Sequence, residues 1–305
     1  MKKLKLKSSN GIDTLNVVLW DVESPKGIVQ IAHGMIEYVE RYDRFAKFLN
    51  SKGFVVVGND HLGHGYTASS VDDLGYMNGP YADVSIVRDM HRVSVAVKRR
   101  YPNLPLFLVG HSMGSFLSRR YAMSYGDEID GLILMGTGEE SKASINMGKF
   151  TLMLNSLIFG ERHRSTVIAL MSIGRYNLKF LNEKSYRSWI SANVENRTRS
   201  GVDKYCNYKF TNKGYRALLD TLAYITNKNH VRLIPNDLPV LFVSGSDDPV
   251  GAFKKGVNEA SNKMIDAGVN DVEIIFYDGM RHEILNEDGY ELVHNDIYEW
   301  IGNHM

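Results

Sequence analysis

The feature of the sequence best suited to covalent chemistry is a serine between two glycines, in the segment GHSMG at residues 110–114. The segment follows an apolar run, Leu106–Val109, and precedes a stretch with helical spacing, which predicts a sharp turn between a strand and a helix. Such a turn requires small neighbours because the strand and the helix nearly touch beside it. It would aim the Ser112 hydroxyl at unpaired backbone N–H groups of the helix N-terminus, which stabilise negative charge. A tight turn without chemistry is the alternative interpretation.

Two further side chains have the types that would make this serine reactive. A serine hydroxyl becomes an effective nucleophile when a base takes its proton, and the base needs an acid to orient it. Asp248 follows the apolar run Val240–Val243, and His282 follows the run Ile274–Tyr277. Both therefore come after the carboxyl end of an expected parallel strand, as Ser112 does, and open α/β sheets bind ligands at that edge. We expect the three side chains to meet at one rim of the sheet.

Five segments of the chain carry a family resemblance: HGMIEYVERY at 33–42, DHLGHG at 60–65, GHSMGS at 110–115, SGSDDPV at 244–250 and YDGMRHEILNE at 277–287. They resemble the monoacylglycerol lipase and lysophospholipase group of α/β-hydrolases, which is sometimes grouped with serine aminopeptidases. The chain order Ser, Asp, His is also that of α/β-hydrolases. The resemblance implies that Ser112 is the nucleophile, His282 the general base and acid, and Asp248 the orienting carboxylate.

The acid has a neighbour, Asp247, that composition does not distinguish from it. Asp248 precedes Pro249, so it also fits a helix N-cap with proline at the first helical position. The fourth position of GSDD is where the resembling family carries its acid, and a capping role would not exclude that one. We therefore assign the orienting role to Asp248 and keep Asp247 as the alternative.

Acyl transfer also needs hydrogen-bond donors for the oxyanion of its tetrahedral intermediate. The hydrolase fold supplies one from the backbone N–H of the residue after the nucleophile, which is Met113. The family motif places the second at the residue after His-Gly, which is Met35, in the loop after the run Ile28–Ala32.

The elements that must position these residues follow from hydrophobic periodicity. Short β-branched runs alternate with helical spacing, which predicts an α/β fold: a mostly parallel sheet flanked by helices, as in α/β-hydrolases. We expect strands at 15–20, 28–32, 54–59, 106–109, 132–135, 239–244 and 272–277, and helices at 41–51, 84–101, 253–267 and 290–301. Lysine and leucine alternate in residues 1–7, which is typical of a strand and not of an export signal.

Residues 137–236 lack this rhythm, so we expect a helical lid inserted there, with the hydrolase core formed by residues 1–136 and 237–305. The expected lid carries an apolar cluster flanked by the cations Lys149, Arg162 and Arg164; its members are Met147, Phe150, Leu152, Met153, Leu154, Leu157, Ile158 and Phe159. Three roles are open for such a cluster: it lines an acyl tunnel, it packs against the core, or it makes transient contact with a membrane surface.

Composition excludes several function classes. The 36 Lys and Arg residues and 35 Asp and Glu residues leave a net charge of +1, which argues against a nucleic-acid partner. The single cysteine, Cys206, favours a reducing compartment and hence the cytoplasm. No apolar run reaches the roughly 18 residues of a membrane span, so we expect a soluble protein. We predict no metal and no cofactor: the resemblance makes the loop with His61 and His64 structural, and the chemistry needs no metal.

The resemblance thus implies a serine hydrolase that cleaves a carboxylic ester, such as a monoacylglycerol or a lysophospholipid, through an acyl-enzyme. One alternative is a peptidase or amidase on the same scaffold, in which lid carboxylates such as Glu161, Glu183 or Glu195 hold the substrate amine. A second is a ligand-binding homologue without catalysis. Epoxide hydrolases and dehalogenases need aspartate where Ser112 stands. The oligomeric state does not follow from the sequence.

Overall fold

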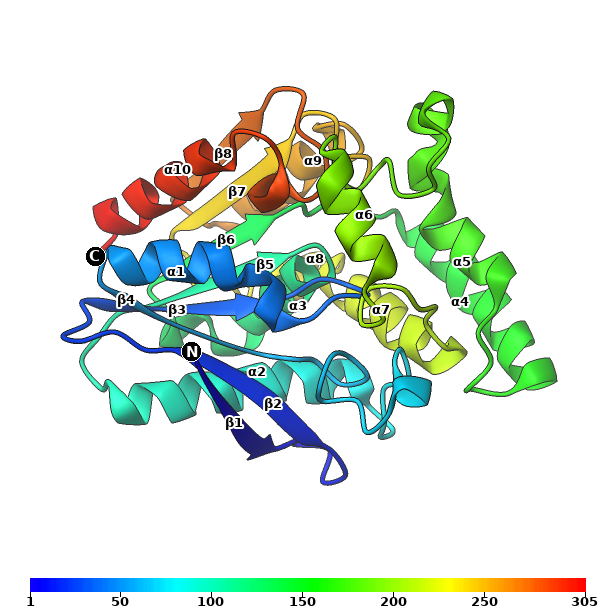
Figure 1. The fold of residues 1–305 in the computed structure, drawn as a ribbon, viewed down its shortest axis with the longest axis horizontal. Coiled ribbons are helices and arrows are strands. Elements are labelled where there is room, and N and C mark those ends of the chain that lie inside the picture. Colours follow the sequence, from blue (N-terminus) through cyan, green and yellow to red (C-terminus); the bar gives the residue numbers. More distant parts are fainter.

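An eight-stranded sheet forms the centre of the computed structural model, which describes residues 1–305 (Figure 1). Its strands are β1 (Lys2–Lys7), β2 (Thr14–Trp20), β3 (Gly27–Ala32), β4 (Phe54–Asn59), β5 (Leu106–His111), β6 (Gly131–Met135), β7 (Val240–Gly245) and β8 (Val272–Tyr277). Their order across the sheet is β1-β2-β4-β3-β5-β6-β7-β8. The strands β3 to β8 are parallel, while β1 and β2 are antiparallel to their neighbours. The predicted α/β fold with a mostly parallel sheet is confirmed.

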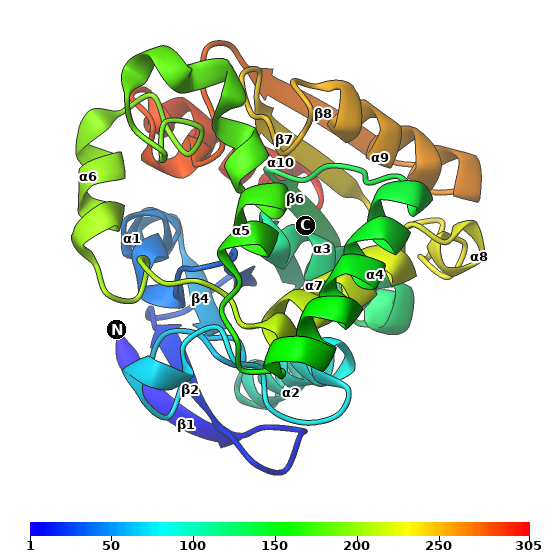
Figure 2. The same ribbon diagram turned by 90° about the vertical axis from the view of Figure 1, so that its right-hand side faces the viewer.

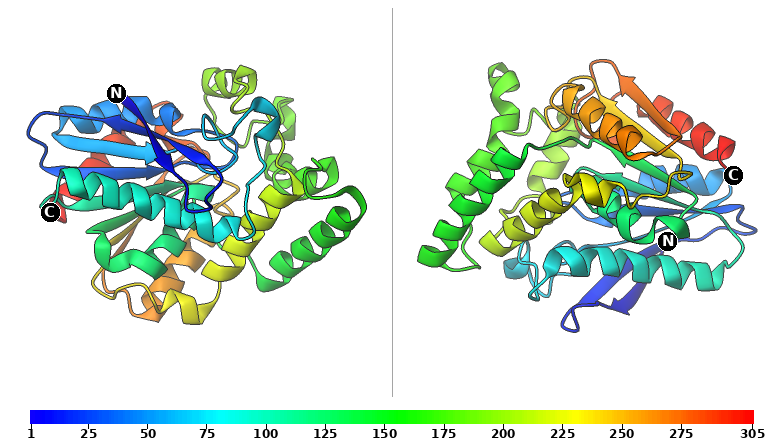
Figure 3. Two further views of the ribbon diagram at one scale, coloured as in Figure 1. Left: turned by 90° about the horizontal axis from the view of Figure 1, so that it is seen from below. Right: turned by 180° about the vertical axis from the view of Figure 1, so that it is seen from behind.

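Helices cover both faces of this sheet because its central strands are apolar on both sides. On one face lie α1 (Asp43–Ser51) and α10 (Tyr290–Asn303), and on the other α2 (Ala82–Arg100), α3 (Met113–Tyr125) and α9 (Lys255–Ala267). Alternate residues of β5 belong to the two cores: Leu106 and Leu108 pack with α2 and α3, whereas Phe107 and Val109 pack with α1 and α10. Figure 3 shows the β1–β2 pair at one edge of the sheet, with β8 at the far side.

Between β6 and β7 the chain forms helices only. They are α4 (Lys142–Phe159), α5 (Thr166–Ser172), the 3-10 helix η4 (Gly174–Glu183), α6 (Val194–Val202), α7 (Asn212–Ile225) and α8 (Lys228–Val231). Serine, threonine and asparagine side chains cap the α-helices, as Ser141 does for α4 and Thr211 for α7. We call residues 137–236 the helical insertion. Figures 1 and 2 show it beside the carboxyl ends of the parallel strands, with α7 packed between α3 and α4.

The apolar cluster of α4 is largely exposed in the structure. Leu152 is buried, but Leu157 and Ile158 are 76% and 72% exposed, and the remaining members are at least 43% exposed. Most of the cluster therefore neither packs against the core nor lines an enclosed tunnel. None of the helices combines the length and the apolar character that a membrane crossing needs.

Many expected boundaries differ from the structure by one or two residues, and two of these differences bear on the site. The strand before the serine continues through His111, so the first two residues of the GHSMG segment belong to β5. The helix expected from residue 253 begins at Lys255, because Ala252, Phe253 and Lys254 all have positive φ. Asp248 consequently does not cap a helix. Its carboxylate accepts a hydrogen bond from the Val250 N–H at 2.9 Å and stabilises a turn instead.

Candidate active site

Ser112 lies on the turn between β5 and α3 in a backbone conformation that L-residues rarely adopt, with φ of 53° and ψ of −121°. The packing around it explains the two glycines of the motif. A Cβ atom on Gly114 would lie 2.0 Å from the Ala32 carbonyl oxygen, and one on Gly110 would lie 2.5 Å from the Gly114 carbonyl oxygen. Only glycine fits at either position. The turn is held against the sheet by the Ser112 N–H, which donates to the Met135 carbonyl at 2.9 Å.

His282 and Asp248 form a buried pair at the carboxyl ends of β8 and β7. The Nδ1 atom of His282 lies 3.1 Å from Oδ1 and 3.0 Å from Oδ2 of Asp248. Asp247 instead points outward, is half exposed and pairs with Lys179 at 3.0 Å. The carboxylate of Asp248 therefore fixes a proton on Nδ1 and leaves Nε2 as the acceptor of the imidazole ring.

His111, the residue that precedes Ser112, connects the serine turn to His282. The rings of His111 and His282 have centroids 4.8 Å apart, and the His111 Nε2 atom lies 3.2 Å from the His282 carbonyl oxygen. The Ser112 hydroxyl and the His282 imidazole do not form a hydrogen bond in the structure. Such bonds are often long in a free enzyme and tighten in the substrate complex.

Met35 and Met113 each offer a free backbone donor beside this serine. Met113 is the first residue of α3, and Met35 lies in the loop after β3; neither N–H has an acceptor in the protein. The two loops are in contact, because a Cβ atom on Gly34 would lie 3.1 Å from the Cβ atom of Ser112. Unpaired N–H groups at a helix start favour an anion.

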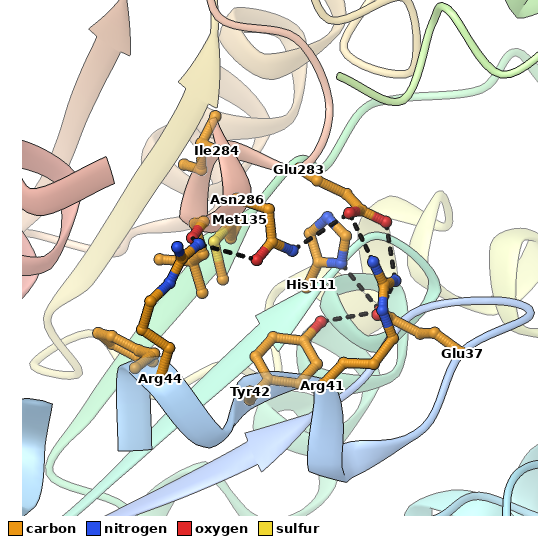
Figure 4. Close-up of a pocket in the computed structure, with 11 residues that line it drawn as sticks. Glu37, Arg41, Tyr42, Arg44, His111, Met135, Glu283, Ile284 and Asn286 are labelled. Atoms are coloured by element: carbon orange, nitrogen blue, oxygen red, sulfur yellow. Dashed lines mark hydrogen bonds and ion pairs between the residues drawn. The ribbon is translucent and has the colours of Figure 1, made fainter. Parts of the chain in front are cut away.

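A buried cluster of charges supports the loop that carries Met35 (Figure 4). The Glu37 Oε1 atom accepts hydrogen bonds from the Gly34 N–H and, at 2.8 Å, from the Tyr42 hydroxyl, and it lies 3.0 Å from His111 Nδ1. Burial alone would raise the pKa of Glu37, but His111 and Arg41 outweigh it and hold that pKa far below its ordinary value. Glu37 is therefore a carboxylate that fixes the backbone beside Ser112.

Arg41 extends the cluster to the loop that carries His282. Its guanidinium donates to Glu37 Oε2 at 2.9 Å and to both carboxylate oxygens of Glu283 at 2.8 Å. Glu283 also accepts from the Asn196 side-chain amide on α6 at 2.8 Å. We call Glu37, Arg41 and Glu283 the charged brace; it borders a cavity of about 20 Å³, visible in Figure 4, with room for roughly one water. The brace joins the Met35 loop, the His282 loop and the helical insertion.

Sequence reasoning missed Arg41 and Glu283 as members of the site. Both lie inside the segments that carry the family resemblance, but 242 positions separate them, and no spacing rule relates them. Trp189, an aromatic residue of the helical insertion, also lies beside the site, with its ring centroid 5.1 Å from that of His282.

The histidines near Asp60 are bonded to the protein itself. His61 Nε2 donates to the His33 carbonyl at 3.1 Å, and His64 Nδ1 donates to the Leu62 carbonyl at 2.9 Å. Burial lowers the pKa of His64 to about 3. The Asp60 carboxylate accepts from backbone N–H groups and from the Asn16 amide. These bonds are those of a structural loop.

The chain is similar to known proteins over most of its length. Residues 23–289 match the family model described as serine aminopeptidase, S33. The chain is 27% identical to a monoglyceride lipase homolog of Monkeypox virus, over 92% of this chain and 91% of the relative. It is 23% identical to a monoacylglycerol lipase of Mycolicibacterium smegmatis, over 97% and 96% of the two chains. The crystal structure of a highly thermostable carboxyl esterase from Bacillus coagulans in complex with glycerol superposes with a TM-score of 0.91 and 28% identity, over 99% and 98% of the chains.

Proposed function

Because the chain belongs to the serine aminopeptidase S33 family, we propose that it is a serine hydrolase that cleaves a carboxylic ester through an acyl-enzyme. The observation that carries the proposal is the buried Asp248–His282 pair at the same edge of the sheet as the strained Ser112. The proposed substrate is a monoacylglycerol, a lysophospholipid or a similar acyl ester. The names of the relatives support this class: one is a monoglyceride lipase homolog, one is a monoacylglycerol lipase, and the carboxyl esterase was solved with glycerol.

The geometry supplies a role for each group in this reaction. His282 Nε2 takes the proton of the Ser112 hydroxyl as the oxygen attacks the ester carbonyl, while Asp248 holds the ring by Nδ1. The N–H groups of Met35 and Met113 donate to the oxyanion, each lowering the barrier by about 3 kcal/mol. The imidazolium then protonates the leaving alcohol, and the neutral ring activates water for deacylation.

We further propose that residues 137–236 act as a lid on a core of residues 1–136 and 237–305. The apolar cluster of α4 supports transient contact with a lipid surface, since a large exposed apolar face on a helix marks an interaction site. We propose a cytoplasmic location on the basis of the single, buried cysteine, Cys206.

The peptidase alternative finds less support in the contacts of the three lid carboxylates. Glu183 pairs with Arg197 and Arg281, Glu161 with Lys213 and Arg216, and Glu195 with Arg199. All three already pair with cations of the protein itself, which weakens the case for any of them as the group that holds a substrate amine.

The test compares the Ser112→Ala variant with the wild type on p-nitrophenyl acyl esters and on aminoacyl anilides. We expect ester turnover by the wild type that falls about 10⁶-fold in the variant, with the fold retained. A fluorophosphonate probe should label the wild type stoichiometrically at Ser112. The control is Ser144→Ala, because Ser144 is an exposed serine on α4. Equal turnover by Ser112→Ala would reject the mechanism, and a preference for anilides would favour the peptidase.

The pH dependence of turnover is a second test of the same mechanism. A histidine general base works only in its neutral form, so kcat should rise between about pH 6 and 8. A flat profile under conditions where chemistry limits the rate would exclude a histidine base.

A further inference from the structure

The helical insertion contributes an aromatic ring to the surroundings of His282. The Trp189 ring is tilted by 40° to the imidazole, with centroids 5.1 Å apart, and its other neighbour is Tyr176 at 5.2 Å. The backbone N–H of Trp189 donates to the Asn177 side-chain oxygen at 3.2 Å. Trp189 is thus held in place by its own segment.

The residues on either side of Trp189 bond to the residues on either side of His282. The Ser188 carbonyl accepts from the Arg281 guanidinium at 2.6 Å, and the Ile190 carbonyl accepts from the Glu283 N–H at 2.8 Å. These two contacts, which we call the paired clamps, set the tryptophan directly beside the histidine. The register would be lost if the insertion shifted by a single residue.

The other neighbours of the His282 imidazole show which interaction is left for Trp189. Asp248 occupies the Nδ1 edge, and His111 lies on another side with its ring centroid 4.8 Å away. The charged neighbours are otherwise engaged: Arg281 pairs with Glu183, and Glu283 pairs with Arg41. Hydrogen bonding to Glu37 raises the pKa of His111 despite its burial. Trp189 is therefore the uncharged aromatic group that contacts the ring.

An aromatic face within about 6 Å attracts a cation. We propose that Trp189 is a positioning residue that keeps the His282 ring against Asp248 and stabilises the imidazolium formed when the ring takes the Ser112 proton. The proposal rests on the function proposed above and extends it to a residue of the helical insertion.

The first test measures the pKa of His282 without turnover. The His282 Cε1–H resonance is titrated by NMR in Ser112→Ala and in Ser112→Ala combined with Trp189→Leu or Trp189→Phe. Loss of the aromatic face should lower the pKa by about half a unit to one unit in the leucine variant, and phenylalanine should restore most of it. A ring that only excludes water has the opposite effect, because its removal hydrates the imidazolium and raises the pKa. A rise or an unchanged pKa would overturn the proposal.

The second test is kinetic and uses p-nitrophenyl acyl esters. Trp189→Leu should lower kcat about three- to tenfold with KM changed less than about twofold, and Trp189→Phe should recover at least half of the loss. Tyr186→Leu is the matched control, because Tyr186 is an exposed aromatic residue of the same segment. Equal losses in both Trp189 variants, or none in the leucine variant, would contradict the proposal. The NMR titration stays decisive even if fluorophosphonate labelling rejects the ester hydrolase.

Discussion

Replacement of Arg41 by methionine removes the guanidinium that the carboxylates of Glu37 and Glu283 share. The Arg41 side chain is only 14% exposed, and its partners are 5% and 8% exposed, so bulk water does not solvate the carboxylates that it leaves behind. Removing one partner of a buried ion pair costs about 3–5 kcal/mol, since the charge left behind is neither solvated nor paired. With roughly 2 °C per kcal/mol in a chain of this size, Tm should fall by about 6–10 °C at pH 8.

The loss should depend on pH in a defined direction. In the wild type the pKa of Glu37 and that of Glu283 are lowered, so their stabilising contribution is present above the unfolded value of 4.5 and is lost as the pH falls below it. Without Arg41, burial favours the neutral carboxyl of Glu283 and raises its pKa in the folded state, whereas His111 still lowers the pKa of Glu37. The stability of the variant then rises as the pH falls from 8 to 5. Over the same range, the contribution of Glu37 and Glu283 to the stability of the wild type changes little. The difference in Tm should therefore be smaller at pH 5.

Thermal unfolding followed by circular dichroism at pH 5 and pH 8 measures both effects. Lys47→Met is the matched control on the same helix, because Lys47 is 69% exposed and pairs with Asp43 at the surface. Such a pair contributes about 0–1 kcal/mol, so Tm should change by less than about 2 °C. An equally small change in Arg41→Met at pH 8, or a difference that is the same at both pH values, would refute the reasoning.

Three further predictions follow from contacts around the site. Asp248→Asn should lower kcat about 10⁴-fold because the amide no longer selects the Nδ1–H tautomer, whereas Asp247→Asn should change kcat less than about threefold; steady-state kinetics of the two variants decides between the aspartates. Gly114→Ala should abolish or severely reduce soluble folded protein, because its methyl group would lie 2.0 Å from a carbonyl oxygen of β3, and well-folded, fully active protein would contradict this packing. His111 has a raised pKa, so its stabilising contribution is complete below about pH 6.5 and is lost as the pH rises through its pKa in the folded protein. The Tm of the wild type should therefore fall more between pH 6 and 9 than the Tm of His111→Asn. Parallel curves of Tm against pH would exclude this role.

The parts of the fold that the sequence predicts are those fixed by local physics. Strands such as β3 and β5 are apolar on both faces, which only a buried parallel sheet accommodates. The GHSMG turn is equally local, since each glycine meets backbone atoms that leave no room for a side chain. The start of α9 was missed by two residues because three consecutive positive φ values, none at a glycine, have no sequence signal.

The contacts that the sequence does not predict join segments far apart in the chain. Arg41 and Glu283 look like ordinary surface charges until the sheet brings their loops together. Trp189 reaches His282 only because the helical insertion docks in one register. In α4 the apolar spacing indicates a helix, but it does not reveal that residues such as Leu157 face solvent. The places of these residues depend on contacts between distant segments, which the type of each residue does not indicate.

The paired clamps restrict the movement of the stretch around Trp189 relative to the His282 loop. Ser188 and Ile190 hold the residues that flank His282, so a movement of this stretch that admitted a substrate would also displace His282, the proposed proton acceptor. Substrate and product are therefore expected to pass without displacing the stretch around Trp189. On gradual warming, turnover should accordingly stop once the stretch around Trp189 separates from the His282 loop, while the eight-stranded sheet is still folded.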